Sequence, residues 1–419
     1  MKRCISCELP PSRSLLLAIV LIAGCARASL FIMAPHVESP DTAEYIASGN
    51  ALFLTGRMAS VVYMPLYPIL IHLAGYNGVI WVQIALSTVT VLLVRRLALA
   101  IWDNELAGLS AALACALHPL LLYFSIARLT ETVAIFFLVL GLVLLYRRRI
   151  LLGSVALVLL NLTRPSFDFI LLLIVATATF AVEQELSWSL LLRRLSMFSL
   201  VYIVLMTPWW AHNLNMYGQF VRLDLADGIT LILENSESYE QHGFDWSVDP
   251  PWAPFSNYAD PVAKNDAMKR AAFDYIRRKP LTWLAASCDR FRRFFTPWPT
   301  GLTEHTTRFL SEVAVKTISA IAILPIFVGA LVALAAFRER WRVMSPLILV
   351  AGYLTALHVA TYALWRYRIP IDPLLIAMAA GPLAALAGRL WPWLPHEWAK
   401  DVPFRRDRGR MAAPEGTLR

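Results

Sequence analysis

Charged residues are scarce in this chain. Only 16% of its 419 residues are charged, whereas 58% are hydrophobic. A soluble globular protein of this length does not need so much apolar surface. Runs of roughly 18–20 apolar residues, long enough to cross a bilayer, recur along most of the chain. The composition therefore excludes an ordinary soluble protein and predicts an all-α polytopic membrane protein.

Several motifs that carry chemistry are also absent. The sequence has no glycine-rich loop for phosphates, no Ser-His-Asp pattern and no histidines at metal-binding spacing. Its five cysteines form no disulfide framework, and the Cys-x-x-Cys at Cys4 and Cys7 has no second pair to complete a zinc site. These absences argue against a nucleotide-driven reaction, so we expect any activated substrate to arrive within the lipid. One or two carboxylates do not define a metal site, which leaves metal dependence open.

The positive charge is distributed in a way typical of membrane topology. The net charge is +9, but the Arg and Lys residues lie in small clusters between apolar runs, which argues against a nucleic-acid partner. About ten spans fit, with two short ones at 150–162 and 169–182: 15–34, 79–99, 106–123, 132–146, 150–162, 169–182, 195–210, 313–337, 343–363 and 369–390. Because the basic clusters follow every second span, we predict that both termini are cytoplasmic.

The same reading divides the chain into five parts. They are a cytoplasmic N-terminus (1–14), a membrane core (15–210) with a large first outer loop (35–78), an extracytoplasmic segment (211–312), C-terminal membrane helices (313–390) and a cytoplasmic tail (391–419) that we expect to be unstructured beyond about 401. Residues 22–25 look like a bacterial lipoprotein cleavage box. Hydrophobicity resumes at 28–34, however, so we expect the first span to be retained.

Each outer segment has recognisable local signals. In the first loop, Pro65 and Pro68 exclude an uninterrupted helix and indicate a bent or partly inserted element. In the second segment, 245–252 reads as a loop, and helices are expected at 261–279 and 280–295. The latter mixes aromatic residues with Arg290, Arg292 and Arg293, which predicts a helix in the headgroup layer with its guanidiniums at lipid phosphates.

An acidic segment, 39–45, follows the first span and is the leading candidate for chemistry. Asp41 has two compatible interpretations: it caps a helix, with Glu44 reaching back, or it acts as a base at the bilayer surface. A helix starting here would place Asp41, Glu44 and Tyr45 on one face. Tyr63 and Tyr67, in the proline element of the same loop, are further candidates for substrate binding.

Ionisable residues at the outer ends of later spans form a second set of candidates. Arg128 and Glu131 either bind substrate or form a salt bridge, and Arg164 is either a ligand or the partner of Asp168. For Arg27 we expect a guanidinium that snorkels to the headgroups.

A third set lies at the outer ends of the spans predicted at 195–210 and 343–363. Arg366, Tyr367 and Arg368 are suited to an anionic group such as phosphate, or else contact lipid headgroups. His212 and Asn213 are candidate donors to a phosphate or a sugar, although a lone histidine is more often a structural residue.

In their order along the chain, these motifs resemble the GT-C superfamily of integral-membrane glycosyltransferases. The bacterial branch related to protein O-mannosyltransferases and lipid A aminoarabinose transferases is the most similar. The motifs are 40–45 (Pro-Asp-Thr-Ala-Glu-Tyr), 65–68 (Pro-Leu-Tyr-Pro), Arg128 with 130–131, 163–165 (Thr-Arg-Pro), 208–213 (Pro-Trp-Trp-Ala-His-Asn) and 366–373 (Arg-Tyr-Arg-Ile-Pro-Ile-Asp-Pro). Together they cover roughly residues 15–390.

The resemblance implies transfer of a sugar, with inversion, from a polyprenyl-phosphate donor to a glycan, lipid or protein acceptor outside a bacterial plasma membrane. It implies that Asp41 is the general base or orients the acceptor. Arg366 and Arg368, helped by Arg128 or His212, would hold the phosphate. The chain has His212 where the family often has Arg, and its 65–68 element lacks a Glu-Lys pair, so the sugar and acceptor stay open. A transporter or flippase of a lipid-linked saccharide is the alternative, and a surface-polysaccharide polymerase or ligase is a third candidate.

Overall fold

The computed structural model describes residues 11–35, 37, 39–300 and 311–390, and these contain helices but no strand. The predicted all-α class is confirmed for this part of the chain. Seven helical segments are long and apolar enough to cross a membrane. They are α1 (Pro11–Met33), α4 (Gly78–Trp102), η1 with α9 (Pro165–Val182), α10 (Trp188–Tyr217), α16 (Glu312–Ala336), η3 with α17 (Arg338–Ala360) and η4 with α18 (Trp365–Leu390).

The remaining three predicted spans are shorter or broken. The span predicted at 106–123 consists of α5 (Glu105–Leu117) and α6 (Pro119–Ile126), which meet at a bend of 52°. Pro119 lacks the amide hydrogen that a continuous helix requires at this position. α7 (Glu131–Tyr146) and α8 (Ile150–Asn161) are 16 and 12 residues long. The described residues therefore contain seven full-length spans, or eight with the bent pair, where about ten were predicted.

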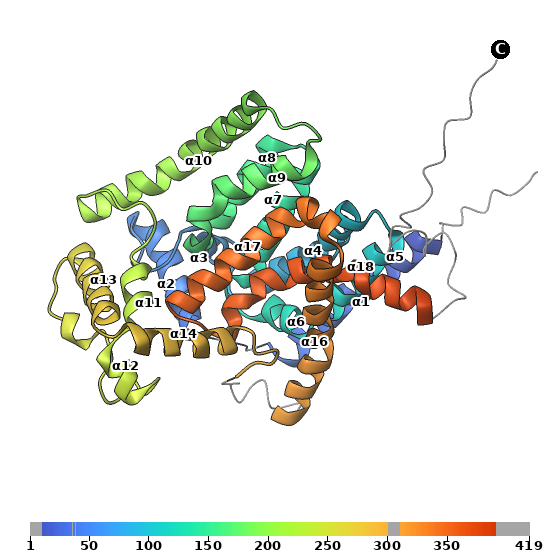
Figure 1. Ribbon diagram of the computed structural model, residues 1–419. Helices are drawn as coiled ribbons and strands as arrows, with labels where there is room; N and C mark the ends of the chain where they lie inside the picture. Colours follow the sequence, from blue (N-terminus) through green and yellow to red (C-terminus); the bar gives the residue numbers. More distant parts are fainter. Residues whose placement is uncertain (1–10, 36, 38, 301–310, 391–419) are drawn as a thin grey trace, which may run out of the picture.

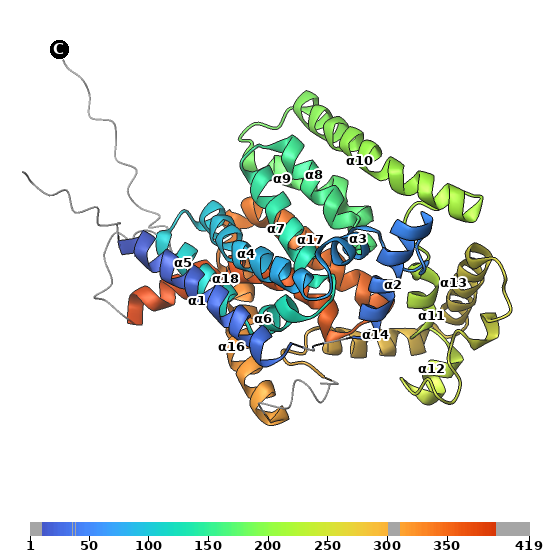
Figure 2. The same cartoon turned by 180° about the vertical axis from the view of Figure 1, so that it is seen from behind.

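The core lies where α4, α7 and α18 pack against each other and against α5, α8 and α16. α18 is the most enclosed span, because most of its apolar stretch is buried by protein. Trp102 at the end of α4 donates a hydrogen bond to the Ala377 carbonyl of α18 (2.9 Å). α10 is the opposite case: it lies at the edge of the molecule against α8 and α9 in both views, with an apolar surface facing outward (Figures 1 and 2).

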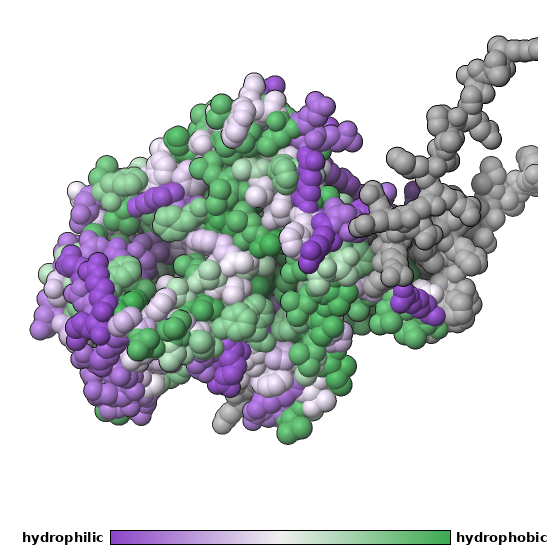
Figure 3. Space-filling view, in the orientation of Figure 1, coloured by the Kyte–Doolittle hydropathy of each residue, from purple (hydrophilic) through white to green (hydrophobic). Residues whose placement is uncertain are grey.

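The polar extramembrane helices gather at one end of the molecule (Figures 1 and 2). α2 (Pro40–Thr55), α11 (Ala226–Ile232), α12 (Glu237–His242) and α13 (Pro261–Arg278) lie there, whereas the start of α1 and the end of α18 lie at the other. In Figure 3 hydrophilic residues concentrate over this end, and hydrophobic residues cover much of the body.

The first outer loop forms two helices, α2 and α3 (Leu66–Ala74), that pack tightly together. A Cβ atom on Gly49 would lie 2.3 Å from the carbonyl oxygen of Pro68, so only glycine permits this approach. Residues 56–65 connect the two helices, and Pro65 and Pro68 lie at the N-cap and in the first turn of α3, where a helix tolerates proline.

α10 continues past residue 210, the predicted end of the span, to Tyr217, and Gly218 follows it in the left-handed conformation (φ 68°). The expected loop and the two expected helices are present, the latter as α13 and α14 (Pro280–Phe294). Directly after the expected loop, η2 (Ala253–Phe255) is a short 3-10 turn. Both long helices begin at a proline, as expected for the first helical position.

Two arginine predictions were wrong. Arg27 does not snorkel: its side chain is fully buried and donates to Ser87 Oγ (2.7 Å) and to the carbonyls of Ala23 and Ala116. Helix α14 packs against α17, and its Arg290 is likewise fully buried, donating to Glu234 Oε2 at 3.0 Å. In both cases a partner from a distant part of the chain satisfies the guanidinium, and hydropathy cannot reveal such a partner.

Candidate active site

Asp41 lies in the first turn of α2, and its carboxylate does not cap the helix. Ser39 is the N-cap residue, and its amide donates to Thr42 Oγ1 (3.2 Å). The Asp41 carboxylate instead accepts a hydrogen bond from the Tyr63 hydroxyl at 3.2 Å. The helix start therefore orients Asp41, while other residues satisfy the cap.

Arg366, 325 residues further along the chain, meets the same carboxylate. Its Nη2 donates to Asp41 Oδ2 at 3.0 Å, and the two side chains are 25% and 27% exposed. The Nε–H of Arg366 is buried and has no hydrogen-bond partner. The pair thus combines a solvent-accessible carboxylate with a guanidinium that still has a donor to offer.

A second ion pair lies close to the first. Glu131, at the start of α7, pairs with Arg164 at 3.0 Å, and its other oxygen has no partner. The guanidinium carbons of Arg164 and Arg366 lie 5.6 and 5.2 Å from the centre of the Tyr367 ring. Tyr367 therefore brings both guanidiniums to one aromatic ring, an arrangement stabilised by cation–π attraction.

Two tyrosines line the carboxylate side of this cluster. The Tyr45 ring packs 4.5 Å from Tyr63 and 4.9 Å from Tyr67. Burial raises the pKa of Tyr45, and the negative charges of Asp41 and Glu131 raise it further. Burial likewise raises the pKa of Tyr63, with the Asp41 charge adding to it. Both phenols stay protonated near neutral pH, so Tyr63 acts as a donor to Asp41.

Three predicted site residues are engaged elsewhere. Arg128 is fully buried and donates to the Tyr76 and Pro35 carbonyls (3.0 and 3.2 Å), which fixes the ends of the first outer loop. Glu131, its predicted salt-bridge partner, pairs with Arg164 instead. Arg368 is fully buried against Asp372 at 2.9 Å. Tyr67 donates to Gln83 at 2.7 Å and is also fully buried. Each of these three buried side chains is held by structural partners, so the reaction proposed below assigns them no role.

Other predicted residues lie near the site or apart from it. Glu44 is exposed on α2 and accepts from Ser60 Oγ at 3.2 Å. His212 stacks on Trp209 (4.9 Å), and Asn213 donates to the carbonyls of Val221 and Leu223. His212 and Asn213 organise the end of α10. In the described part of the chain, neither forms a hydrogen bond or an ion pair with the Asp41–Arg366 pair or the Glu131–Arg164 pair.

Asp168 is not the partner of Arg164. It pairs with Arg222 at 2.6 Å and accepts from Asn161 at 3.0 Å. The separate pairing leaves Arg164 beside Tyr367 and Glu131.

Glu234 is a structurally important residue that the sequence reasoning missed. It accepts from both Arg290 and Arg293 of α14 and is buried. Arg293 also donates to the Ala363 carbonyl at 2.8 Å, three residues before Arg366. A single glutamate in a polar loop carries no pattern that would distinguish it before the fold is known.

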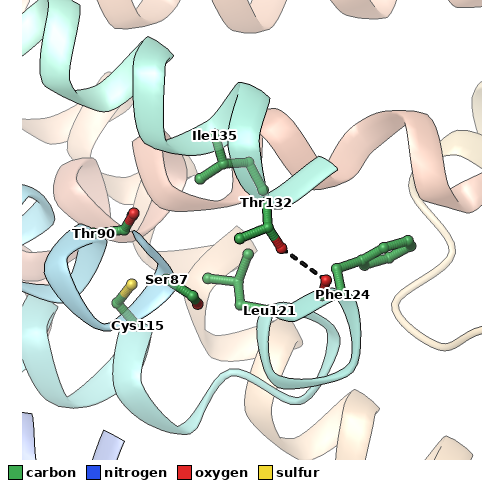
Figure 4. A pocket seen from close by; sticks show the side chains of 7 residues that line it. All are labelled: Ser87, Thr90, Cys115, Leu121, Phe124, Thr132 and Ile135. Carbon is green, nitrogen blue, oxygen red and sulfur yellow. Dashed lines mark hydrogen bonds between the residues drawn. The ribbon is translucent and has the colours of Figure 1, made fainter. Parts of the chain in front are cut away.

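A small cavity lies among α4, α5, α6 and α7 and is separate from these ion pairs (Figure 4). Its seven lining residues are Ser87, Thr90, Cys115, Leu121, Phe124, Thr132 and Ile135. The Thr132 hydroxyl donates to the Phe124 carbonyl at 2.7 Å. No carboxylate or basic group lines it, so it offers no acid–base chemistry. Among all described residues, no three His, Cys, Asp or Glu side chains are grouped to hold a metal ion.

Comparisons with known proteins give distant structural likenesses. No family model and no curated protein matches the chain. The oligosaccharyltransferase of Archaeoglobus fulgidus, solved with a tethered acceptor peptide, is 14% identical with a TM-score of 0.48, covering 92% of this chain and 52% of that one. ArnT from Cupriavidus metallidurans, bound to undecaprenyl phosphate, is 14% identical with a TM-score of 0.39, covering 90% and 79%. The chain spans about half the length of the archaeal protein.

Proposed function

We propose that this chain is a membrane-embedded glycosyltransferase. It moves a sugar from a polyprenyl-phosphate donor to an acceptor hydroxyl on the extracytoplasmic side, with inversion at the anomeric carbon. The observation that carries the proposal is the contact between Asp41 and Arg366 (3.0 Å), a partly exposed carboxylate beside a guanidinium with an unused donor. The order of the sequence motifs, which resembles the GT-C superfamily, supports the same reaction.

Asp41 has the capacity to bind and deprotonate an acceptor. A carboxylate accepts about four hydrogen bonds, and Tyr63 and Arg366 occupy one on each oxygen. An acceptor hydroxyl therefore binds without displacing either residue. As its oxygen attacks the anomeric carbon, its proton passes to Asp41.

Arg366 has the capacity to stabilise the leaving group at the same time. When the bond between the anomeric carbon and the phosphate oxygen breaks, that oxygen keeps the electron pair and its negative charge grows. The partly exposed guanidinium of Arg366 places its positive charge beside that oxygen, and this stabilises the growing negative charge. One planar guanidinium thus holds the base and the leaving phosphate in a fixed relation, and Arg164 adds a second positive charge across Tyr367.

The test is a comparison of Asp41→Asn with wild type in a strain that lacks the chromosomal gene. Envelope glycans are analysed by mass, and binding of polyprenyl-phosphate sugar to the purified chain is measured in parallel. We expect the variant to lose the wild-type mass increment and to keep donor binding, because the amide cannot take the proton. Glu312→Gln is the matched control, because Glu312 is 61% exposed at the start of α16 and pairs with Lys316 at 2.6 Å; it should behave as wild type. Full transfer by Asp41→Asn would reduce Asp41 to a structural role.

A transporter of a lipid-linked saccharide is the second candidate, and the bend between α5 and α6 is the observation that favours it. Transporters often use discontinuous helices at their substrate sites. In sealed vesicles without acceptor, a transporter would move the labelled lipid between leaflets, whereas the proposed enzyme would leave its distribution unchanged.

A further inference from the structure

A series of aromatic rings connects the outer segment with the candidate active site. Trp252 and Trp246 lie 5.7 Å apart, Trp246 and Phe244 5.5 Å, and Phe244 and Tyr362 6.4 Å, between ring centres. Tyr362 lies 5.7 Å from Tyr367, over which Arg366 is placed. We call these five rings the aromatic track. It leads from the loop after α12 to the residue next to Arg366.

The rings of the track are accessible. Phe244 is 42% exposed, and the other four rings are partly exposed. Rings that served only as a core would be buried, as Phe294 and Phe337 are. Rings that served only as a membrane belt would not be expected to continue into a cluster of ion pairs.

The loop that carries Trp246 and Phe244 is held in place. Gly243 adopts a φ of 61°, which turns the chain sharply after α12 and favours glycine. The Asp245 carboxylate accepts from the Ser247 amide at 3.1 Å, and Ser238 Oγ donates to the Asp249 carbonyl. A loop fixed in this way loses little further freedom when it binds a ligand.

Polar groups accompany the rings. The guanidinium of Arg293 lies 5.1 Å from the centre of the Phe244 ring and 3.3 Å from the Tyr239 hydroxyl. Asp245 and Ser247 are exposed beside Trp246. Aromatic faces with hydrogen-bonding groups at their edges match a sugar, whose C–H face packs on a ring while its hydroxyls need donors and acceptors.

We propose that the aromatic track binds a saccharide acceptor and presents its terminal hydroxyl to Asp41. This assignment rests on the proposed function and narrows it, because the acceptor class becomes a glycan rather than a protein or a lipid. Trp246 and Phe244 hold the inner sugar units, and Tyr362 and Tyr367 lead the terminal unit to the Asp41–Arg366 pair.

The test measures saccharide binding to the full-length chain in detergent. The probe is the water-soluble saccharide fraction of the source cell envelope, freed of lipid, digested with protease and labelled at its reducing ends. Fluorescence polarisation gives the dissociation constant for wild type, for the double variant Phe244→Ala/Trp246→Ala, and for Asp41→Asn. Phe220→Ala is the matched control, since Phe220 is 63% exposed, packs against Trp210 and lies off the track.

We expect saturable binding by wild type, a dissociation constant at least tenfold higher for the double variant, and an unchanged constant for Phe220→Ala. Asp41→Asn, which alters the contact to the terminal hydroxyl alone, should raise the constant by less than the double variant does. The thermal midpoint of each variant establishes that it is folded. Absence of saturable binding by wild type, equal binding by a folded double variant, or competition only by the envelope protein or lipid fraction would overturn the assignment. None of these results would contradict the proposed sugar transfer. That proposal is contradicted by a different result, full transfer by Asp41→Asn.

Discussion

At the scale of single residues, the decisive contact joins two side chains that the sequence places 325 residues apart. The motifs around Asp41 and Arg366 each predict a role in chemistry. That Arg366, and not Arg368, faces Asp41 follows from the short helix η4 (Trp365–Ile371), which turns Arg368 inward to Asp372. Two arginines in the same tripeptide motif look equivalent in the sequence, and only the packing of η4 distinguishes them.

Replacing Arg366 with lysine tests whether one guanidinium serves both the base and the phosphate. An ammonium is a point charge and lacks the planar fork that reaches two partners. We expect Arg366→Lys to lower kcat/KM for sugar transfer by about 10²-fold, as for removal of one preorganised donor. Arg292→Lys is the control, because Arg292 is 79% exposed and pairs with Asp289 at 2.8 Å on the surface. An equal decrease of kcat/KM in both variants, or an unchanged kcat/KM in Arg366→Lys, would contradict the proposal that one guanidinium serves both the base and the phosphate.

The buried carboxyl of Asp224 predicts how the stability of the protein changes with pH. Burial raises its pKa to about 7, with the charge of Asp227 adding to the shift and a hydrogen bond from the Ala226 amide opposing it. The folded state therefore holds this proton more tightly than the unfolded state, so stability decreases as the pH rises from about 4 to 7 and then levels off. Asp224→Asn removes this penalty. Its thermal midpoint in detergent should exceed that of wild type by a margin that grows over this range, and a constant margin would show that Asp224 does not titrate in this way.

At the scale of helices, much was predictable because periodicity and breakers act locally. α13 and α14 begin at prolines and end within a residue or so of the predicted positions. The break at Pro119 and the extension of α10 past residue 210 to Tyr217 were missed, whereas the continuation through Pro208 was predicted. A proline either breaks a helix or is tolerated within it according to its packing, and the local sequence does not decide which.

The link between the outer segment and η4 is also a property of packing. Asn235 donates to the Thr361 carbonyl at 2.9 Å and Trp283 to the Ala360 carbonyl at 3.1 Å. Arg290 and Arg293, paired with Glu234, hold the carbonyls of Ala360 and Ala363. The connection that leads into Arg366 is therefore fixed by the extramembrane helices.

Glu234→Gln should loosen this connection. The change leaves the buried guanidinium of Arg290 without its carboxylate partner, which costs about 3–5 kcal/mol for a buried pair, and leaves Arg293 paired with Asp289 alone. We expect a lower thermal midpoint and weaker donor binding in the folded fraction. Glu240→Gln is the control, because Glu240 pairs with Lys279 at the surface and its loss should leave the midpoint unchanged. A midpoint for Glu234→Gln equal to that of the control would show that the network does not stabilise η4.

At the scale of the whole molecule, the hydropathy pattern predicted the helical class, and the charge pattern predicted that both ends of the membrane region lie together. The start of α1 and the end of α18 do lie at the same end of the structure, away from α2 and α11 (Figures 1 and 2). Which end faces the cytoplasm remains a prediction from the basic clusters. The network around the site was not predictable, since it joins residues from α2, α7 and η4 that only the fold brings together.

The sidedness of α2 is the measurement that tests the central claim most directly. A variant with its five native cysteines replaced carries one new cysteine, at Glu44→Cys beside the site or at Arg149→Cys in a predicted inner connection, both exposed positions. Intact cells are treated with a membrane-impermeant maleimide. We predict that the cysteine at position 44 is labelled at once and that the one at 149 is labelled only after permeabilisation. The reverse pattern would place Asp41 and Arg366 in the cytoplasm and contradict transfer at the outer face.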